Sequence, residues 1–302
     1  MFVVKYKNFF IGGSLFLALA SLFLLLFFKL QVGIDFTGGS LIEVAYTKER
    51  PEFAQVDEGL AKLSLGAYRL QPTGTDSYVL RTKALSEVER LPVLDALSLK
   101  GTSEMTEKRF NSVGSVIGDE LRRKSFTGIF VVIFAIVVFI AFSFRKVSRP
   151  VSSWKYGVVA IITLAHDVLI PVGVFALLGK TSGVEVDILF VTALLAILGF
   201  SIHDTIVVFD RIRENLRINE EHRKKESFDV TVGKSLHQTY ARSLNTSLTV
   251  LIPLLVLYFI GGDSTKYFCL ALFVGVIAGA YSSIILASPL LVYIQERSKS
   301  SS

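Results

Sequence analysis

Long apolar runs alternate with charged segments along the chain, and these runs predict membrane-spanning helices. A helix needs about 20 mostly apolar residues to cross the hydrocarbon core of a bilayer. A polar segment at 261–266 divides the last and longest run into two spans. The runs are Phe9–Phe28, Phe126–Phe144, Tyr156–Leu178, Ile188–Phe209 and the divided tract Leu244–Ile294. This pattern predicts a polytopic α-helical membrane protein with six transmembrane helices.

The first run also has a feature of a secretory signal peptide, because Ala18-Leu19-Ala20 has the form of a cleavage site. The apolar run continues from Leu22 to Phe28, so cleavage would fall within the hydrocarbon core. We therefore expect an uncleaved first helix.

A segment with the composition of a soluble domain separates the first two spans. Turn residues such as Gly38-Gly39 and Pro72-Thr73-Gly74 divide it into short alternating and amphipathic stretches. The expected strands are Leu41–Tyr46, Tyr68–Gln71, Tyr78–Thr82 and Ser103–Phe110, and the expected helices are Pro51–Leu65 and Ser86–Leu97. This βαββαβ order predicts a small α+β domain of the ferredoxin-like type. The chain then divides into a transmembrane helix at 1–29, this domain at 30–125, a five-helix bundle at 126–296 with a cytoplasmic loop at 210–242, and a tail at 297–302.

The loops between the spans differ in their basic residues, and cytoplasmic loops carry the excess of Lys and Arg in membrane proteins. The segment 145–155 holds four basic residues and 210–242 holds eight, whereas Gly179–Val186 and Gly261–Lys266 hold one lysine each. The basic residues are Arg145, Lys146, Arg149 and Lys155 in the first segment, and Arg211, Arg213, Arg217, Arg223, Lys224, Lys225, Lys234 and Arg242 in the second. We expect both termini in the cytoplasm and the small domain outside it.

Composition and motifs narrow the function classes. With 51% hydrophobic residues, the chain is too apolar for a soluble enzyme of its length. The net charge is +6, but the basic residues cluster beside the apolar runs and are not interleaved with aromatic residues, so nucleic-acid binding is not expected. The single cysteine, Cys269, excludes an intrachain disulfide and a thiolate metal cluster. No GxxxxGK[ST], HExxH or GxSxG motif occurs, and we expect no catalytic residues, cofactor or metal.

Polar residues inside the apolar runs are the candidates for chemistry. A charged side chain near the bilayer centre costs roughly 2.5–3.5 kcal/mol on insertion scales, so Asp204 and Asp167 need partners there. Each aspartate follows a histidine, His203 or His166, and the short loop between the two spans should place both pairs in one polar seam. Our hypothesis is that Asp204 takes up and releases protons. The alternative is that these groups only hold helices together by hydrogen bonds.

Three further groups of residues are of interest. Arg242, Asn245 and Thr246 mark the start of the fifth span. Charged residues after the fourth span are interpreted as a helix end at the membrane surface, with a gating role as the alternative: Asp210, Arg211, Arg213 and Glu214. Small residues recur at four-residue spacing in the sixth span and predict a close-packing helix face: Ala271, Gly275, Gly279, Ser283 and Ala287.

Five motifs follow one another along the chain. The longest, Gly199–Asn215, reads GFSIHDTIVVFDRIREN. The others are Val32–Gly39, Val113-Gly114 with Gly118–Arg122, Ala165–Val168, and Tyr281–Ser283 with Ala287–Leu290. Together they resemble the SecF members of the SecD/SecF family of bacterial protein translocase subunits, within the resistance-nodulation-division superfamily. Two positions depart from the family pattern, because His203 stands where Asn is usual and Ser115 where Pro is frequent.

The resemblance implies a subunit of the Sec protein-export machinery in the bacterial inner membrane, where the proton motive force promotes late steps of translocation. It implies a heterodimer with SecD, association with the SecYEG channel and YajC, surrounding membrane lipid, and an unfolded exported polypeptide as client. It also implies that Asp204 is the relay carboxylate and that Arg242 and Thr246 are its partners on the fifth span. Asp167 and His203 complete the set of proton-relay candidates.

The sequence is also compatible with two other classes of protein. A small-molecule proton antiporter of the same superfamily would use similar carboxylate chemistry, but it carries two large exterior domains and about twice as many spans in one chain. A passive scaffold of the translocon would need no titrating carboxylate. Replacement of Asp204 by Asn distinguishes a scaffold from a proton-driven subunit.

Overall fold

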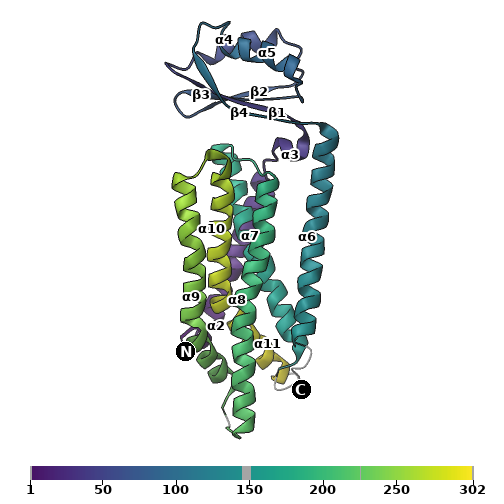
Figure 1. Ribbon diagram of the computed structural model, residues 1–302. Coiled ribbons are helices and arrows are strands. Elements are labelled where there is room, and N and C mark those ends of the chain that lie inside the picture. The colour runs from purple at the N-terminus through teal and green to yellow at the C-terminus, as the bar shows by residue number, and fades with distance from the viewer. Residues whose placement is uncertain (1, 145–150, 225, 301–302) are drawn as a thin grey trace. The chain divides into compact units, whose positions relative to one another are not determined.

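The computed structural model describes residues 2–144, 151–224 and 226–300, and it divides into two compact units (Figure 1). One unit comprises residues 1–31 and 127–302 and contains the long helices, and the other comprises residues 32–126 and contains the β-sheet. Some residues on which the sequence predictions rest lie outside the described ranges: Arg145, Lys146 and Arg149 of the first basic loop, Lys225 of the second, and 301–302 of the tail.

Six helices are long and apolar enough to cross a membrane in the part of the chain that the structure describes, which confirms the predicted number of spans. A π-helical turn joins α10 to α11, so that these two helices form one span. The elements are α1 (Phe2–Lys5), α2 (Lys7–Phe28), α6 (Ser115–Phe144), α7 (Ser153–Ser182), α8 (Ile188–Glu221), α9 (Phe228–Ile260), α10 (Asp263–Ser282), the π-turn η1 (Ser283–Ala287) and α11 (Ser288–Ser300).

Helices α7, α8 and the α10–α11 span form the interior of the helical unit. Half of the most apolar stretch of each is buried, whereas the corresponding fraction is 17% or less in α2, α6 and α9. Tyr156 of α7 and Phe209 of α8 meet edge to face in the core, with ring centroids 5.2 Å apart. The outer helices expose large apolar side chains such as Phe16 and Phe259, which is the surface that lipid covers in a membrane protein.

Helices α8 and α9 extend well beyond the apolar runs from which they were predicted. Because α8 ends at Glu221 and α9 begins at Phe228, most of the segment 210–242, predicted as a loop, is helical. Ile212 and Leu236 are fully buried in this region, so the apolar face of each helix continues past its membrane-spanning run. The charged residues of this segment mark the limits of the two apolar runs, but both helices continue beyond those limits.

The sheet unit contains four antiparallel strands in the order β2-β3-β1-β4. Helices α4 and α5 cover one face of this sheet (Figure 1). Alternation along β1 directs Ile42 and Val44 into the core, where they join Leu60 of α4 and Leu97 of α5. The elements are α3 (Ile34–Thr37), β1 (Gly39–Tyr46), α4 (Phe53–Ala61), β2 (Arg69–Thr73), β3 (Ser77–Thr82), α5 (Glu87–Leu97) and β4 (Met105–Val113).

The paired glycines Gly38 and Gly39 connect α3 to β1 in a conformation that other residues rarely adopt. Their φ angles are +71° and +120°. A Cβ atom on Gly39 would lie 2.6 Å from the carbonyl oxygen of Thr82, and one on Gly38 would lie 2.8 Å from the Cα atom of Ser115. Both positions therefore require glycine for space as well as for conformation.

Candidate functional site

Asp204 lies on α8 in the interior of the helical unit, with 3% of its surface exposed. Its two carboxylate oxygens accept hydrogen bonds from serines on two other helical elements. Ser243 of α9 donates to Oδ1 at 2.8 Å, and Ser283 of η1 donates to Oδ2 at 2.7 Å. Among the described residues, no cation forms an ion pair with Asp204. A buried carboxylate whose donors are neutral bears the cost of desolvating its charge without a neighbouring cation to offset it.

Asp167 forms a second, completely buried carboxylate site on α7. Ser201 of α8 and Ser282 of α10 donate to its Oδ2 at 2.5 and 2.6 Å. Its Oδ1 lies 2.8 Å from Nδ1 of His166, the preceding residue, which is 4% exposed. Ser201 and Asp204 are neighbours on α8 at i and i+3, so one helix contributes to both carboxylate sites.

Ser282 and Ser283 join the two sites from the same segment of backbone. Ser282 is the last residue of α10 and Ser283 is the first residue of η1, yet each donates to a different carboxylate. Their hydroxyls also lie 3.2 and 3.1 Å from the carbonyl oxygens of Gly279 and Ala280 on the same helix, which gives each hydroxyl a second acceptor. Single π-helical turns of this kind occur frequently at functional sites.

A stripe of hydroxyl side chains along α9 leads to Asp204, and the sequence analysis did not identify it. Its members are Thr231, Ser235, Thr239, Ser243 and Ser247, with exposed fractions of 0–6%. Four of them donate to the carbonyl oxygen four residues earlier, whereas Ser243 donates to Asp204 instead. The signal was present as a Ser or Thr at every fourth position, which places the hydroxyls on one helix face.

The remaining proton-relay candidates do not contact Asp204 in this structure. His203 and Arg242 are exposed, and Thr246 is half-buried. No hydrogen bond or ion pair joins any of these three described residues to Asp204, whose donors are the two serines. Arg242 immediately precedes Ser243, so its side chain points about 100° away around the axis of α9.

The charged residues that follow Asp204 form a cluster on α8 beside α9, in which Asp210 and Glu214 are exposed and the two arginines are half-buried. Arg211 donates to Glu214 at 2.6 Å and to the side chain of Gln238 on α9 at 2.7 Å. Arg213 pairs with Asp210 at 3.6 Å, and Asp210 is 71% exposed. Exposed ion pairs contribute little net stability, so the link to Gln238 is the feature that connects this cluster to the neighbouring helix.

The small residues of the last span face α8. A Cβ atom on Gly275 would lie 2.1 Å from Cδ1 of Ile197, and one on Gly279 would lie 3.1 Å from Cβ of Ser201. Ala271, Ser283 and Ala287 are fully buried. The close approach at Gly279 brings α10 within reach of Asp167 through Ser282, so packing and the polar site depend on the same contact.

In the residue ranges that the structure describes, no group of three or more His, Cys, Asp or Glu side chains is placed to hold a metal ion. Cys269 is a buried free thiol. The side chains that meet at the two buried aspartates are hydroxyls and one imidazole.

Comparison with known families covers both units of the chain. The family described as "Protein export membrane protein SecD/SecF, C-terminal" matches residues 94–297, and the "SecD/SecF GG Motif" matches residues 23–49. The chain belongs to the SecD/SecF family. The second match contains Gly38 and Gly39, the two positions at which this chain requires glycine for space and for conformation.

Individual SecD/SecF relatives agree with this assignment over nearly the full length. Protein translocase subunit SecF of Thermobaculum terrenum is 43% identical over 302 residues, which covers 96% of this chain and 92% of the relative. The SecF of Anaerolinea thermophila is 36% identical over 285 residues, which cover 94% of this chain and 90% of that relative. The chain is thus a multi-pass membrane protein and a subunit of Sec protein translocation.

A solved SecD/SecF structure has the same fold. The crystal structure of SecDF, a translocon-associated membrane protein from Thermus thermophilus, matches with a TM-score of 0.81 at 31% identity. The match covers 97% of this chain and 38% of the SecDF chain, so this chain corresponds to only part of that protein.

Proposed function

We propose that this chain is a non-enzymatic, proton-coupled subunit that uses the proton motive force to promote late steps of polypeptide translocation. The observation that carries the proposal is the environment of Asp204, which is buried and, among the described residues, accepts hydrogen bonds from the side chains of Ser243 and Ser283 alone. Protonation of the Asp204 carboxylate removes the buried charge, so that the neutral group no longer needs a hydrogen-bond donor at each oxygen. Proton binding therefore changes the relative stability of different arrangements of α8, α9 and η1, which is what a coupled cycle requires.

The hydroxyl stripe of α9 supports a route for protons to this carboxylate. It reaches from Thr231, near the charged end of α9, to Ser247, one helical turn beyond Ser243. A hydroxyl both donates and accepts, and each of these groups can rotate away from its backbone carbonyl to bond another donor or acceptor. In the proposed cycle Arg242 approaches Asp204 when α9 turns, while Thr246, His203 and Asp167 act as accessory members of the relay.

The proposal extends to partners and placement. The chain would form a heterodimer with SecD, in keeping with its match to 38% of a SecDF chain, and would work with SecYEG and YajC on an unfolded exported polypeptide. It would lie among the lipids of the bacterial inner membrane with both termini in the cytoplasm. The domain at 30–125 would be extracytoplasmic and ferredoxin-like, and its βαββαβ element order and its strand order support that fold.

The decisive experiment compares export of a slow-folding secreted reporter in vesicles carrying the unaltered chain, Asp204→Asn or Glu221→Gln. Asp204→Asn keeps the shape of the side chain but cannot titrate, whereas Glu221 is an exposed carboxylate at the end of the same helix. We expect loss of gradient-stimulated export only with Asp204→Asn, while co-purification with SecD and SecYEG remains normal. Unchanged export with Asp204→Asn would instead indicate a passive scaffold.

The same vesicles distinguish the coupling ion. We expect an imposed proton gradient to stimulate export and an imposed sodium gradient at constant pH to have no effect. Gradient-driven efflux of a small molecule without any effect on export would support the antiporter alternative.

A further inference from the structure

Three consecutive side chains at the junction of α10 and η1 each contact a different helix. Ser282 and Ser283 donate to the buried aspartates of α7 and α8. Tyr281, the residue before them, forms a hydrogen bond with Ser14 of α2. Successive residues of a helix point about 100° apart, so three in a row can reach three neighbours of a central helix. The segment of backbone that holds both carboxylates therefore also holds the first span.

The hydroxyl of Tyr281 is the donor in its bond with Ser14. The hydroxyl hydrogen of Ser14 is directed to the carbonyl oxygen of Phe10 at 3.0 Å, which leaves its oxygen to accept from the tyrosine. Ser14 is fully buried and Tyr281 is half-buried. The tyrosine ring also lies against His166 of α7, with ring centroids 5.6 Å apart. The ring therefore contacts α7 while its hydroxyl bonds to α2.

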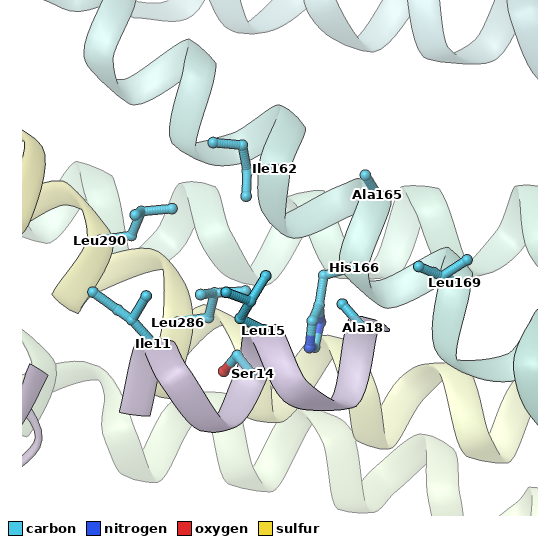
Figure 2. A pocket seen from close by; sticks show the side chains of 10 residues that line it. All are labelled: Ile11, Ser14, Leu15, Ala18, Ile162, Ala165, His166, Leu169, Leu286 and Leu290. Carbon is cyan, nitrogen blue, oxygen red and sulfur yellow. The ribbon is translucent and has the colours of Figure 1, made fainter. Parts of the chain in front are cut away.

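Helix α2 packs tightly at one position and loosely at another. Of its residues, all of which the structure describes, only Ser14 and Ser21 are buried, and they lie on one face. At Ser21 the two backbones touch, since a Cβ atom on Gly173 of α7 would lie 2.6 Å from the Cα atom of Ser21. Beside Ser14, in contrast, a cavity of about 380 Å³ lies among α2, α7 and the η1–α11 segment (Figure 2). The part of α2 that bears Ser14 therefore has room to move about a close contact at Ser21.

The bond to Tyr281 restrains this loosely packed part of α2. Within the described residues, it is the only side-chain hydrogen bond that joins the apolar run of α2 to another helix. Beyond Ser21, α2 ends at Phe28, and the chain enters the sheet unit at residue 32. A movement of α2 is thus passed along the chain to the sheet unit.

We propose that Tyr281 is a positioning residue that transmits proton binding at Asp204 to α2, and through α2 to the sheet unit. Protonation of Asp204 removes the charge that holds Ser283, which changes the preferred position of the backbone at 281–283. Because the Tyr281 hydroxyl bonds to Ser14, the same movement displaces the loosely packed part of α2, and α2 turns about Ser21. The inference rests on the proposed function and adds the route by which a proton bound in the helical unit acts on the sheet unit.

The ionisable groups that face this segment lie on α7, α8 and α10. They are His166, Asp167, Asp204 and Tyr281. Helix α2 has no ionisable side chain between residues 8 and 28, the η1–α11 segment has none before residue 293, and α9 presents the hydroxyl of Ser243. A change of charge at this junction therefore occurs on α7, α8 or the tyrosine itself.

The test measures the position of α2 by double electron–electron resonance in the full-length protein in lipid nanodiscs. Spin-labelled cysteines replace the exposed residues Phe23 of α2 and Phe259 of α9, and a reference pair replaces Leu177 of α7 and Phe259. The native Cys269 is buried and is left in place. Asp204→Asn represents the protonated carboxylate, because its side chain is neutral. This substitution should shift the α2–α9 distance by about 1–2 Å more than the α7–α9 distance, the usual size of a helix shift.

Three further substitutions identify the coupling residue. Tyr281→Phe keeps the ring beside His166, Ser14→Ala removes the acceptor, and each should abolish the additional shift of α2 and preserve the α7–α9 response. Tyr267→Phe removes an exposed hydroxyl from the same helix and should behave like the unaltered chain.

The outcomes separate this inference from the proposed function. An additional α2 shift that persists in Tyr281→Phe or Ser14→Ala, or an α2 shift no larger than that of α7 in the unaltered background, would overturn the role of Tyr281 alone. The absence of a shift in both label pairs with Asp204→Asn would contradict the proposed function as well.

Discussion

Ser282 and Ser283 are adjacent in the chain, but their hydroxyls donate to two different buried carboxylates. Ser282 Oγ lies 2.6 Å from Asp167 Oδ2, and Ser283 Oγ lies 2.7 Å from Asp204 Oδ2. The junction between α10 and η1 is thus held by both carboxylates at once. A movement of this backbone that shortens the hydrogen bond to one aspartate also changes the hydrogen bond to the other. The positions of Asp167 and Asp204 are therefore coupled through the two serines.

Replacement of these serines one at a time should separate the two sites. Ser283→Ala removes one of the two donors that Asp204 has among the described residues and leaves Ser243, and loss of a donor to a buried charged group costs about 1–3 kcal/mol. Ser282→Ala leaves both donors of Asp204 in place. We expect Ser283→Ala to reduce gradient-stimulated export at least tenfold and Ser282→Ala to reduce it less, measured with the reporter at matched protein levels. Equal losses in the two variants would argue against Asp204 as the principal coupling group.

The features that could be predicted from the sequence depend on the length of the apolar runs and on the position of a residue within a run. The six spans follow from apolar runs of sufficient length, and Asp167 and Asp204 were selected because each lies inside such a run. Both aspartates are indeed buried, at 0% and 3% exposure. These predictions needed no knowledge of which helices are neighbours.

The partners of the carboxylates could not be predicted in the same way. Ser201, Ser243, Ser282 and Ser283 come from four helical elements, α8, α9, α10 and η1, and their orientation depends on helix rotation and on the π-turn at η1. Local sequence carries no clear signal for a π-turn, since it depends on tertiary contacts. Serine is also common in membrane helices, so its presence alone does not indicate a functional contact.

Glycine at 173 should be essential for the packing of α2 on α7. A Cβ atom there would lie 2.6 Å from the Cα atom of Ser21, and a backbone atom cannot move aside without displacing α2. We expect Gly173→Ala to destabilise the folded protein by about 1–3 kcal/mol, measured by thermal unfolding in detergent. Gly157→Ala is the matched control on the same helix, because its nearest neighbour would be 3.8 Å away, an ordinary contact.

The glycine at 275 presents a different kind of crowding. Its added Cβ atom would meet the end of the Ile197 side chain at 2.1 Å, and a side chain can be shortened. We expect Gly275→Ala to lower the unfolding temperature and a second substitution, Ile197→Val, to restore part of the loss because it removes the Cδ1 atom. If Ile197→Val adds its own loss instead, the two positions do not share this contact.

Tyr46 should stabilise the sheet unit through its hydroxyl. This group donates to the carbonyl oxygen of Leu97 at 2.8 Å, and burial, followed by the influence of Tyr78, raises the pKa of Tyr46 to about 12. Tyr46→Phe should lower the stability of the unit by about 1 kcal/mol, seen as faster hydrogen exchange in β1 and α5. Since the raised pKa favours the neutral phenol, its contribution is present below about pH 10 and is lost as the pH rises toward 12. Tyr68→Phe, which removes a less buried hydroxyl, should have a smaller effect.

Acid should loosen the start of α5 before the rest of the sheet unit. Glu89 closes a capping box with Ser86, and the backbone N–H of Ser86, followed by the ammonium group of Lys83, lowers the pKa of Glu89 to about 2. The ionised carboxylate therefore contributes its full stabilisation above the ordinary pKa of 4.5. This stabilisation is lost as the pH falls from 4.5 toward 2. Hydrogen exchange of the first turn of α5, corrected for the intrinsic pH dependence of exchange, should show this loss of protection between those values. Glu89→Gln should make the protection independent of pH over the same interval, because its neutral side chain does not titrate. Glu87→Gln changes an exposed carboxylate in the same turn and should preserve the acid transition, so a transition that disappears with Glu87→Gln would assign the effect to the wrong residue.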